Sequence, residues 1–86
     1  MLIRTSPEVA VYPNPAKGDV RISIPYQGKD STFLQLLSAD GQLLLEKTVL
    51  MEKQNQTLTL DLNSYANGSY ILIVDGLEHK IVNYKD

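Results

Sequence analysis

Residues 69–84 read SYILIVDGLEHKIVNY, and this stretch decides the fold more directly than any other. Ser69–Val74 is a short run with apolar side chains on both faces of an extended chain. Asp75–Gly76 follows, and an Asp-Gly pair between two apolar runs is a strong hairpin signal, because glycine takes the positive φ that such turns need. Leu77–Tyr84 is a second run centred on Lys80-Ile81-Val82. The stretch predicts two antiparallel strands joined by a tight turn.

The same pattern occurs earlier in the chain around Asp40–Gly41. The preceding run, Thr32–Ser38, carries apolar residues on both faces, which favours a central strand of a sheet. The return run, Leu43–Leu50, begins with three consecutive leucines that break the strict alternation. Either a β-bulge or burial of both strand faces would explain them.

Further strands follow from the alternation of apolar and polar residues with a period of two. Prolines and single glycines separate these runs, and no segment shows a convincing helical stripe. The expected strands are Glu8–Tyr12, Val20–Ile24, Thr32–Ser38, Leu43–Leu50, Thr57–Leu62, Ser69–Val74 and Leu77–Tyr84. We therefore predict an all-β fold, an immunoglobulin-like antiparallel β-sandwich of about seven strands. An open barrel is the alternative.

Length and charge exclude several classes of function. A chain of 86 residues forms one domain, and at this size little interior is left for a deep catalytic cleft. The net charge of −2 and the scattered basic residues argue against nucleic acid and against a membrane surface as partners. No segment reaches the roughly 18 apolar residues of a membrane helix, so we expect no membrane insertion. The first residues lack the apolar region of a signal peptide, which indicates a cytosolic protein or a fragment of a longer precursor.

Residues able to carry chemistry are few. The chain has no cysteine, which excludes a disulfide framework and a thiolate metal site. His79 is the only histidine, and we expect it on a strand surface rather than in a metal or catalytic site. Asp19, Asp40 and Asp75 fall at predicted turns, where aspartate bonds nearby backbone, although spacing alone leaves a loop calcium site open. We predict a non-enzymatic protein without a cofactor.

A series of short motifs points to a known family. It opens with Tyr12-Pro13-Asn14-Pro15-Ala16 and the alternating run Val20–Ile24, continues with Asp40–Gly41 and Gly68-Ser69-Tyr70, and ends with Lys80-Ile81-Val82. In this order, the motifs resemble the C-terminal sorting domain of proteins exported by the type IX secretion system of Bacteroidetes. The resemblance covers residues 9–86, which leaves residues 1–8 as an expected linker remnant from an upstream cargo domain.

The resemblance implies a role in transport. Domains of this family follow a larger cargo, and the outer-membrane translocon of the type IX system recognises them after the cargo has entered the periplasm. In many members a surface sortase-like protease removes the domain and joins the cargo to anionic lipopolysaccharide. By this resemblance the cut would fall within or before residues 1–8, and the cargo would be secreted or held at the cell surface.

The motifs also suggest which residues the transport machinery contacts. The last strand of a sandwich often lies at an edge, with unpaired backbone groups available for strand addition. We therefore expect the recognition surface at Lys80–Tyr84 and at the Pro13-Asn14-Pro15 loop. The full set of candidates, all carried by the family motifs, is Pro13, Asn14, Pro15, Gly41, Gly68, Tyr70, Lys80, Ile81 and Val82. A rigid turn at the loop, and core packing by Ile81 or Val82, are the structural alternatives.

Two other functions remain open on the sequence alone. An accessory carbohydrate-binding module would need a row of exposed aromatic side chains or a calcium site. A passive spacer would tolerate further domains after it, whereas a sorting signal must lie at the C-terminus of its parent protein.

Overall fold

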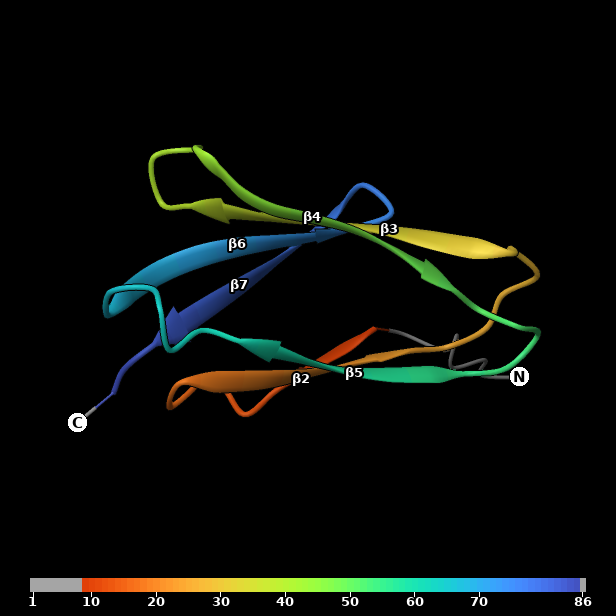
Figure 1. The fold of residues 1–86 in the computed structure, drawn as a ribbon, viewed down its shortest axis with the longest axis horizontal. Helices are drawn as coiled ribbons and strands as arrows, with labels where there is room; N and C mark the ends of the chain where they lie inside the picture. The colour runs from red at the N-terminus through yellow and green to blue at the C-terminus, as the bar shows by residue number, and fades with distance from the viewer. Residues whose placement is uncertain (1–8, 86) are drawn as a thin grey trace, which may run out of the picture.

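The computed structural model describes residues 9–85 and shows two antiparallel sheets packed face to face (Figure 1). A three-stranded sheet has the order β1-β2-β5, and a four-stranded sheet has the order β4-β3-β6-β7. The predicted β-sandwich is confirmed, and the alternative of an open barrel is wrong. The described part of the chain holds no helix long and apolar enough to cross a membrane.

The three-stranded sheet follows directly from alternating sequence. Its strands are β1 (Ala10–Tyr12), β2 (Asp19–Ile24) and β5 (Gln56–Asp61). β2 is central and pairs with β5 over its whole length, from Asp19 opposite Asp61 to Ile24 opposite Gln56. Every second residue of β2 is buried, as the alternation predicts. Glu8, the expected start of the first strand, and the expected linker 1–8 lie outside the described residues.

The four-stranded sheet contains both hairpins that the Asp-Gly pairs predict. Its strands are β3 (Ser31–Ser38), β4 (Leu43–Leu50), β6 (Gly68–Val74) and β7 (Leu77–Asn83). β3 lies between β4 and β6, which confirms its prediction as a central strand. At the β6–β7 turn both Asp75 and Gly76 have positive φ, of 50° and 85°. This is the backbone that a two-residue hairpin turn matched to the strand twist requires.

A β-bulge explains the three consecutive leucines of β4. Leu36 pairs with Leu45, whereas its neighbour Leu37 pairs with Leu43, so Leu44 is an extra residue without a partner on β3. Such an insertion shifts the side-chain alternation by one position. β4 is an edge strand, and Leu43 and Leu45 both remain exposed to solvent. Burial of both faces is therefore not the reason for the leucine run.

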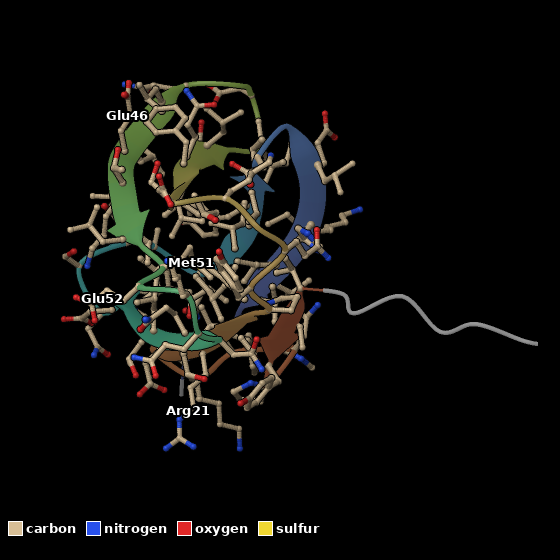
Figure 2. All side chains as sticks on the ribbon, turned by 90° about the vertical axis from the view of Figure 1, so that its right-hand side faces the viewer. Arg21, Glu46, Met51 and Glu52 are labelled. Atoms are coloured by element: carbon tan, nitrogen blue, oxygen red, sulfur yellow. The ribbon has the colours of Figure 1, made fainter. Side chains whose placement is uncertain are left out.

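The core lies between the two layers. It consists of inward-facing aliphatic side chains from both sheets, and Met51 joins it from the segment after β4, as Figure 2 shows between the layers. The largest fully buried residues are Ile22, Leu36, Met51, Leu62, Leu72, Ile81, Val20 and Asn83. All but one of these are apolar, and the exception, Asn83, lies at the end of the last strand.

Candidate functional site: the loop that pairs with the last strand

The first motif of the chain lies against the last strand. β7 is an edge strand, and the Asn14 side chain bonds to the side of it that no other strand covers. The Asn14 amide nitrogen donates to the Lys80 carbonyl at 3.0 Å, and its amide oxygen accepts from the Val82 N–H at 3.0 Å. A side-chain amide carries one donor group and one acceptor group, so Asn14 takes the place of a backbone partner.

The loop continues this pairing with its own backbone. The Ala16 N–H donates to the Val82 carbonyl at 2.7 Å, and the Tyr84 N–H donates to the Ala16 carbonyl at 2.8 Å. Ala16 and Asn83 form a parallel bridge, and Ala16 is fully buried. The peptide bonds before Pro13 and Pro15 are both cis. We call Pro13–Ala16 the clasp loop, since it holds the edge of β7 and joins it to the three-stranded sheet.

The clasp loop corrects one expectation. We predicted unpaired backbone groups along Lys80–Tyr84, open to an added strand. The Lys80 carbonyl, both backbone groups of Val82 and the Tyr84 N–H instead bond to the clasp loop. The physical reason is that an exposed edge favours uncontrolled pairing with other chains, and covering it prevents such contact. An incoming strand would have to displace the clasp loop along this part of β7.

Asn83 secures the same region from within the core. Its amide oxygen accepts from the Gly18 N–H at 3.2 Å, and its amide nitrogen donates to the Leu62 and Tyr65 carbonyls at 3.3 and 3.5 Å. Asn83 is fully buried, so its amide gives three backbone groups at this place a hydrogen-bond partner. Without such partners these groups would destabilise the fold. The three partners belong to the segments after the clasp loop and after β5. Asn83 thus ties the last strand to the opposite layer.

The other predicted residues divide between surface and core. On β7, Lys80 and Val82 point outward, whereas Ile81 between them is fully buried, so core packing falls to Ile81 and not to Val82. Tyr70 is buried on the adjacent strand, where it pairs with Ile81 and its hydroxyl donates to the Ala66 carbonyl. These positions place Lys80 and Val82 at the surface beside the clasp loop.

The two predicted glycines have separate places. Gly68 begins β6 and pairs with Asn83, so it lies close to the same end of β7. Gly41 lies in the β3–β4 turn with a φ of 90°, and β6 lies between β3 and β7. The structure therefore brings the first and last motifs together and leaves Gly41 apart from them.

A cleft opens at the other end of β7. Its volume is about 490 Å³, and Ile24, Met51, Val74 and His79 are among its lining residues. Such a cleft was not expected for a chain of this length. Residues of both layers line it, including Ile24 at the end of β2 and Val74 at the end of β6.

His79 differs from its prediction as a surface residue. It stands on the inward face of β7, two positions before the buried Ile81, and its Nε2 atom is buried without a hydrogen-bond partner among the described residues. The period-two alternation from Ile81 is the sequence signal that places it there. In residues 9–85, no group of three or more His, Asp or Glu side chains is placed to hold a metal ion.

Comparison with known proteins identifies the motifs. A family model described as "Secretion system C-terminal sorting domain" matches residues 10–84, almost the whole described chain. The searches of curated proteins and of solved structures give no match. The matched range begins with β1 and ends just after β7, so it contains both the clasp loop and the strand that this loop holds.

Proposed function

Because this chain belongs to the secretion system C-terminal sorting domain family, a non-catalytic family of type IX sorting signals, we propose that its clasp loop and last strand form the surface that the transport machinery reads. The family implies recognition by the type IX machinery and secretion of the attached cargo. The proposed surface consists of the exposed residues of the clasp loop with the outward side chains of Lys80 and Val82, and we call it the composite surface.

One observation carries the proposal. Asn14 and Val82 are 68 residues apart in sequence, yet a 3.0 Å hydrogen bond joins them. The composite surface therefore exists only in the folded domain, whereas an unfolded chain presents the same motifs far apart. A receptor that binds this surface selects cargo whose sorting domain has folded. Recognition by side chains of a closed edge also needs no displacement of the loop, unlike strand addition.

The wider transport scheme follows the same proposal. The partners are the outer-membrane type IX translocon and a surface sortase-like protease, which removes the domain and transfers the cargo to anionic lipopolysaccharide at the cell surface. The first strand of the sandwich begins at Ala10. A cut within or before residues 1–8 would separate an upstream cargo domain and leave both sheets intact, which supports that position for the cleavage site.

The test attaches the chain to the C-terminus of a periplasmic reporter in a host with a working type IX system. Deletion of residues 80–86 is unsuitable because it removes Ile81 and Asn83 from the core. The informative variants are Asn14→Ala, which also removes the two bonds to β7, and Lys80→Ala, which removes only an exposed side chain. The control is Asn55→Ala, which removes a comparable bond, from the Tyr26 N–H to an exposed asparagine at 2.8 Å, near the opposite end of β2.

We expect both surface variants to reduce delivery of the reporter to the cell surface, and the control to deliver normally. Thermal unfolding of the three purified variants verifies that each remains folded. If Asn14→Ala and Lys80→Ala are folded and are delivered like the unmodified chain, the composite surface is not the recognition site.

A further inference from the structure

The outer faces of the two sheets differ sharply in polarity. A sheet with one face in water normally alternates apolar residues inward with polar residues outward. The three-stranded sheet obeys this rule: Arg21 and Ser23 on β2, and Thr57 and Thr59 on β5, point outward. Figure 2 shows Arg21 extending from this face into solvent. Nothing about this face suggests a partner.

The four-stranded sheet breaks the rule on its two central strands. Tyr70, Leu72 and Val74 fill the core side of β6, so Ile71 and Ile73 stand on the outer side and are only partly covered. On β3, Phe33 and Leu37 stand on the same outer side, and Val82 on β7 adds to them. Phe33 is 42% exposed and Val82 is 38% exposed. We call these five residues the outer apolar face; contiguous apolar surface of this kind marks an interaction site.

Charged residues beside the outer apolar face show what could cover it. β7 carries Glu78 and Lys80 on its outer side, two positions apart. Each begins a row across the sheet: Lys80 pairs with Ile71, which pairs with Leu37, and Glu78 pairs with Ile73, which pairs with Gln35. The two rows are adjacent, and each has an isoleucine on β6. At the β7 end, one row carries a positive charge and the other a negative charge.

We propose that a second copy of this chain covers the outer apolar face. In a symmetric dimer each copy contributes the same patch, and residue i contacts residue j while j contacts i. The two-fold axis of this dimer lies in the interface, perpendicular to the strands and midway between the two rows. It therefore places each row of one copy against the other row of the second copy. It sets Lys80 against Glu78 of the second copy and Ile71 against Ile73 of the second copy. The interface therefore gains two reciprocal ion pairs around an apolar centre.

The size of the face sets the strength of the dimer. With about 4.8 Å between strands and about 3.4 Å per residue, the three strands that carry the face offer roughly 340 Å² per copy. The total of roughly 700 Å² lies below the 1,200 Å² or so at which stable interfaces begin. The dimer is therefore weak and forms where copies are concentrated.

The test measures self-association of the 86-residue chain by sedimentation equilibrium at concentrations up to about 1 mM. Ile73→Glu buries a charge in the centre of the interface and abolishes dimerisation. The matched control is Thr59→Glu, which adds the same charge to the outer side of β5 and leaves dimerisation unchanged. Salt weakens the dimer because it screens the ion pairs at the rim.

Two charge variants test whether Lys80 faces Glu78 of the second copy, as the two-fold axis predicts. Glu78→Lys and Lys80→Glu each face like charges in their own dimers, so each alone loses about tenfold or more in affinity. Mixed together, the two variants set lysines against glutamates at both positions and recover a heterodimer. The double variant Glu78→Lys/Lys80→Glu recovers the homodimer for the same reason.

Each result bears on the proposal directly. A chain that stays monomeric at 1 mM overturns it, as does a pair of charge variants that fails to recover on mixing. If the chain is monomeric but Ile73→Glu prevents delivery of a cargo reporter, the outer apolar face belongs to a transport component and not to a second copy. The sorting role is tested separately by delivery of Asn14→Ala, because Asn14 belongs to the composite surface and lies outside the proposed dimer interface, whereas Lys80 and Val82 belong to both.

Discussion

At the scale of single residues, one buried polar side chain contributes to the fold alongside the apolar core. Asn83 is the clearest case, since a buried amide satisfies backbone groups of three segments. Substituting an apolar side chain of similar size would retain packing but leave those groups buried without partners. A lost partner for a buried polar group costs more than the bond itself contributes.

Asn83→Leu is therefore expected to destabilise the domain by about 2–3 kcal/mol. Urea unfolding of the purified chain measures the change. Asn67→Ala is the control: Asn67 makes two bonds to the Lys85 backbone but is exposed, so its loss costs less than about 1 kcal/mol. Equal effects of the two substitutions would show that burial of Asn83 is unimportant.

Gly18 is required both by its backbone and by its surroundings. Its φ of 97° lies in the left-handed region, and a Cβ placed there would collide with the Asn63 side chain. Gly41, with a φ of 90°, has open space around it. We expect Gly41→Ala to cost about 1–2 kcal/mol, the conformational term alone. Gly18→Ala should cost up to about 1 kcal/mol more, because the exposed Asn63 side chain must turn away and lose its bond to Asp61. Thermal unfolding of the two variants separates the terms, and equal melting points would refute the contribution of the collision.

Asp40 provides a test by pH. The Ser38 hydroxyl donates to its carboxylate and is the main cause that lowers the pKa of Asp40 below its ordinary value. A lowered pKa means that the charged form is favoured in the folded chain. The stabilisation is therefore complete above the ordinary pKa and is lost as the pH falls through the lowered one. An NMR titration of Ser38→Ala should show the pKa of Asp40 rising towards 3.8; an unchanged value would exclude the hydroxyl as the cause.

At the scale of elements, the clasp loop gives the last strand a second partner without adding a strand. One side-chain amide and one alanine cover the edge of β7 from Lys80 to Tyr84. Within residues 9–85, no loop is bonded to the outer edge of β4 in this way, and β4 instead carries the Leu44 bulge. The two edges are thus protected in different ways, because a bulge also discourages the pairing of an edge strand.

Hydrogen exchange can verify the clasp. The Val82 N–H should exchange slowly although it lies on an edge, and Asn14→Ala should speed its exchange roughly fivefold through the loss of about 1 kcal/mol. The Ile81 N–H is the internal control, since Ile81 pairs with Tyr70 on β6 and its exchange should be unchanged. Rapid exchange of Val82 in the unmodified chain would contradict the Asn14 bond.

At the scale of the whole molecule, stability rests on a thin core. A small domain of this size has a free energy of unfolding of roughly 4–13 kcal/mol. Single buried side chains therefore account for a large share of it. Leu72 is 1% exposed and belongs to the core cluster, whereas Leu50, the same residue type at the end of β4, is 67% exposed.

Leu72→Ala should remove about 2–5 kcal/mol, enough to leave a marginal domain, while Leu50→Ala should change stability by less than about 0.5 kcal/mol. Chemical denaturation of both variants compares the same deletion in two environments. If Leu72→Ala leaves the free energy of unfolding almost unchanged, the core can collapse into the space that the removed atoms occupied.

Local patterns in the sequence predict most of this architecture. The alternation in β2 and β5 and the two Asp-Gly pairs place the strands within one or two residues, and the two apolar faces of β3 identify its central position. These signals are local, since the alternation within a segment indicates a strand and the residues of a turn indicate the backbone conformation that the turn needs. The motif residues of the candidate site are likewise visible in the sequence.

Contacts across the chain are what the sequence leaves undetermined. Nothing near Asn14 indicates that its partners are Lys80 and Val82, because pairing between distant segments depends on the register of the whole sheet. Asn83 looks like part of a polar tail until the burial of Ile81 fixes which face of β7 points inward. The same face assignment brings His79 inward, against the expectation for a surface residue.

The clasp loop also sets an order of events. Its partners lie in the last strand, so a polypeptide that stops short of residue 80 has neither the Lys80 acceptor nor the Val82 donor for Asn14, however well its first six strands are formed. Closure of the clasp loop thus requires that the chain extend through β7. A chain truncated before residue 80 by proteolysis would therefore lack the composite surface that we propose as the recognition site.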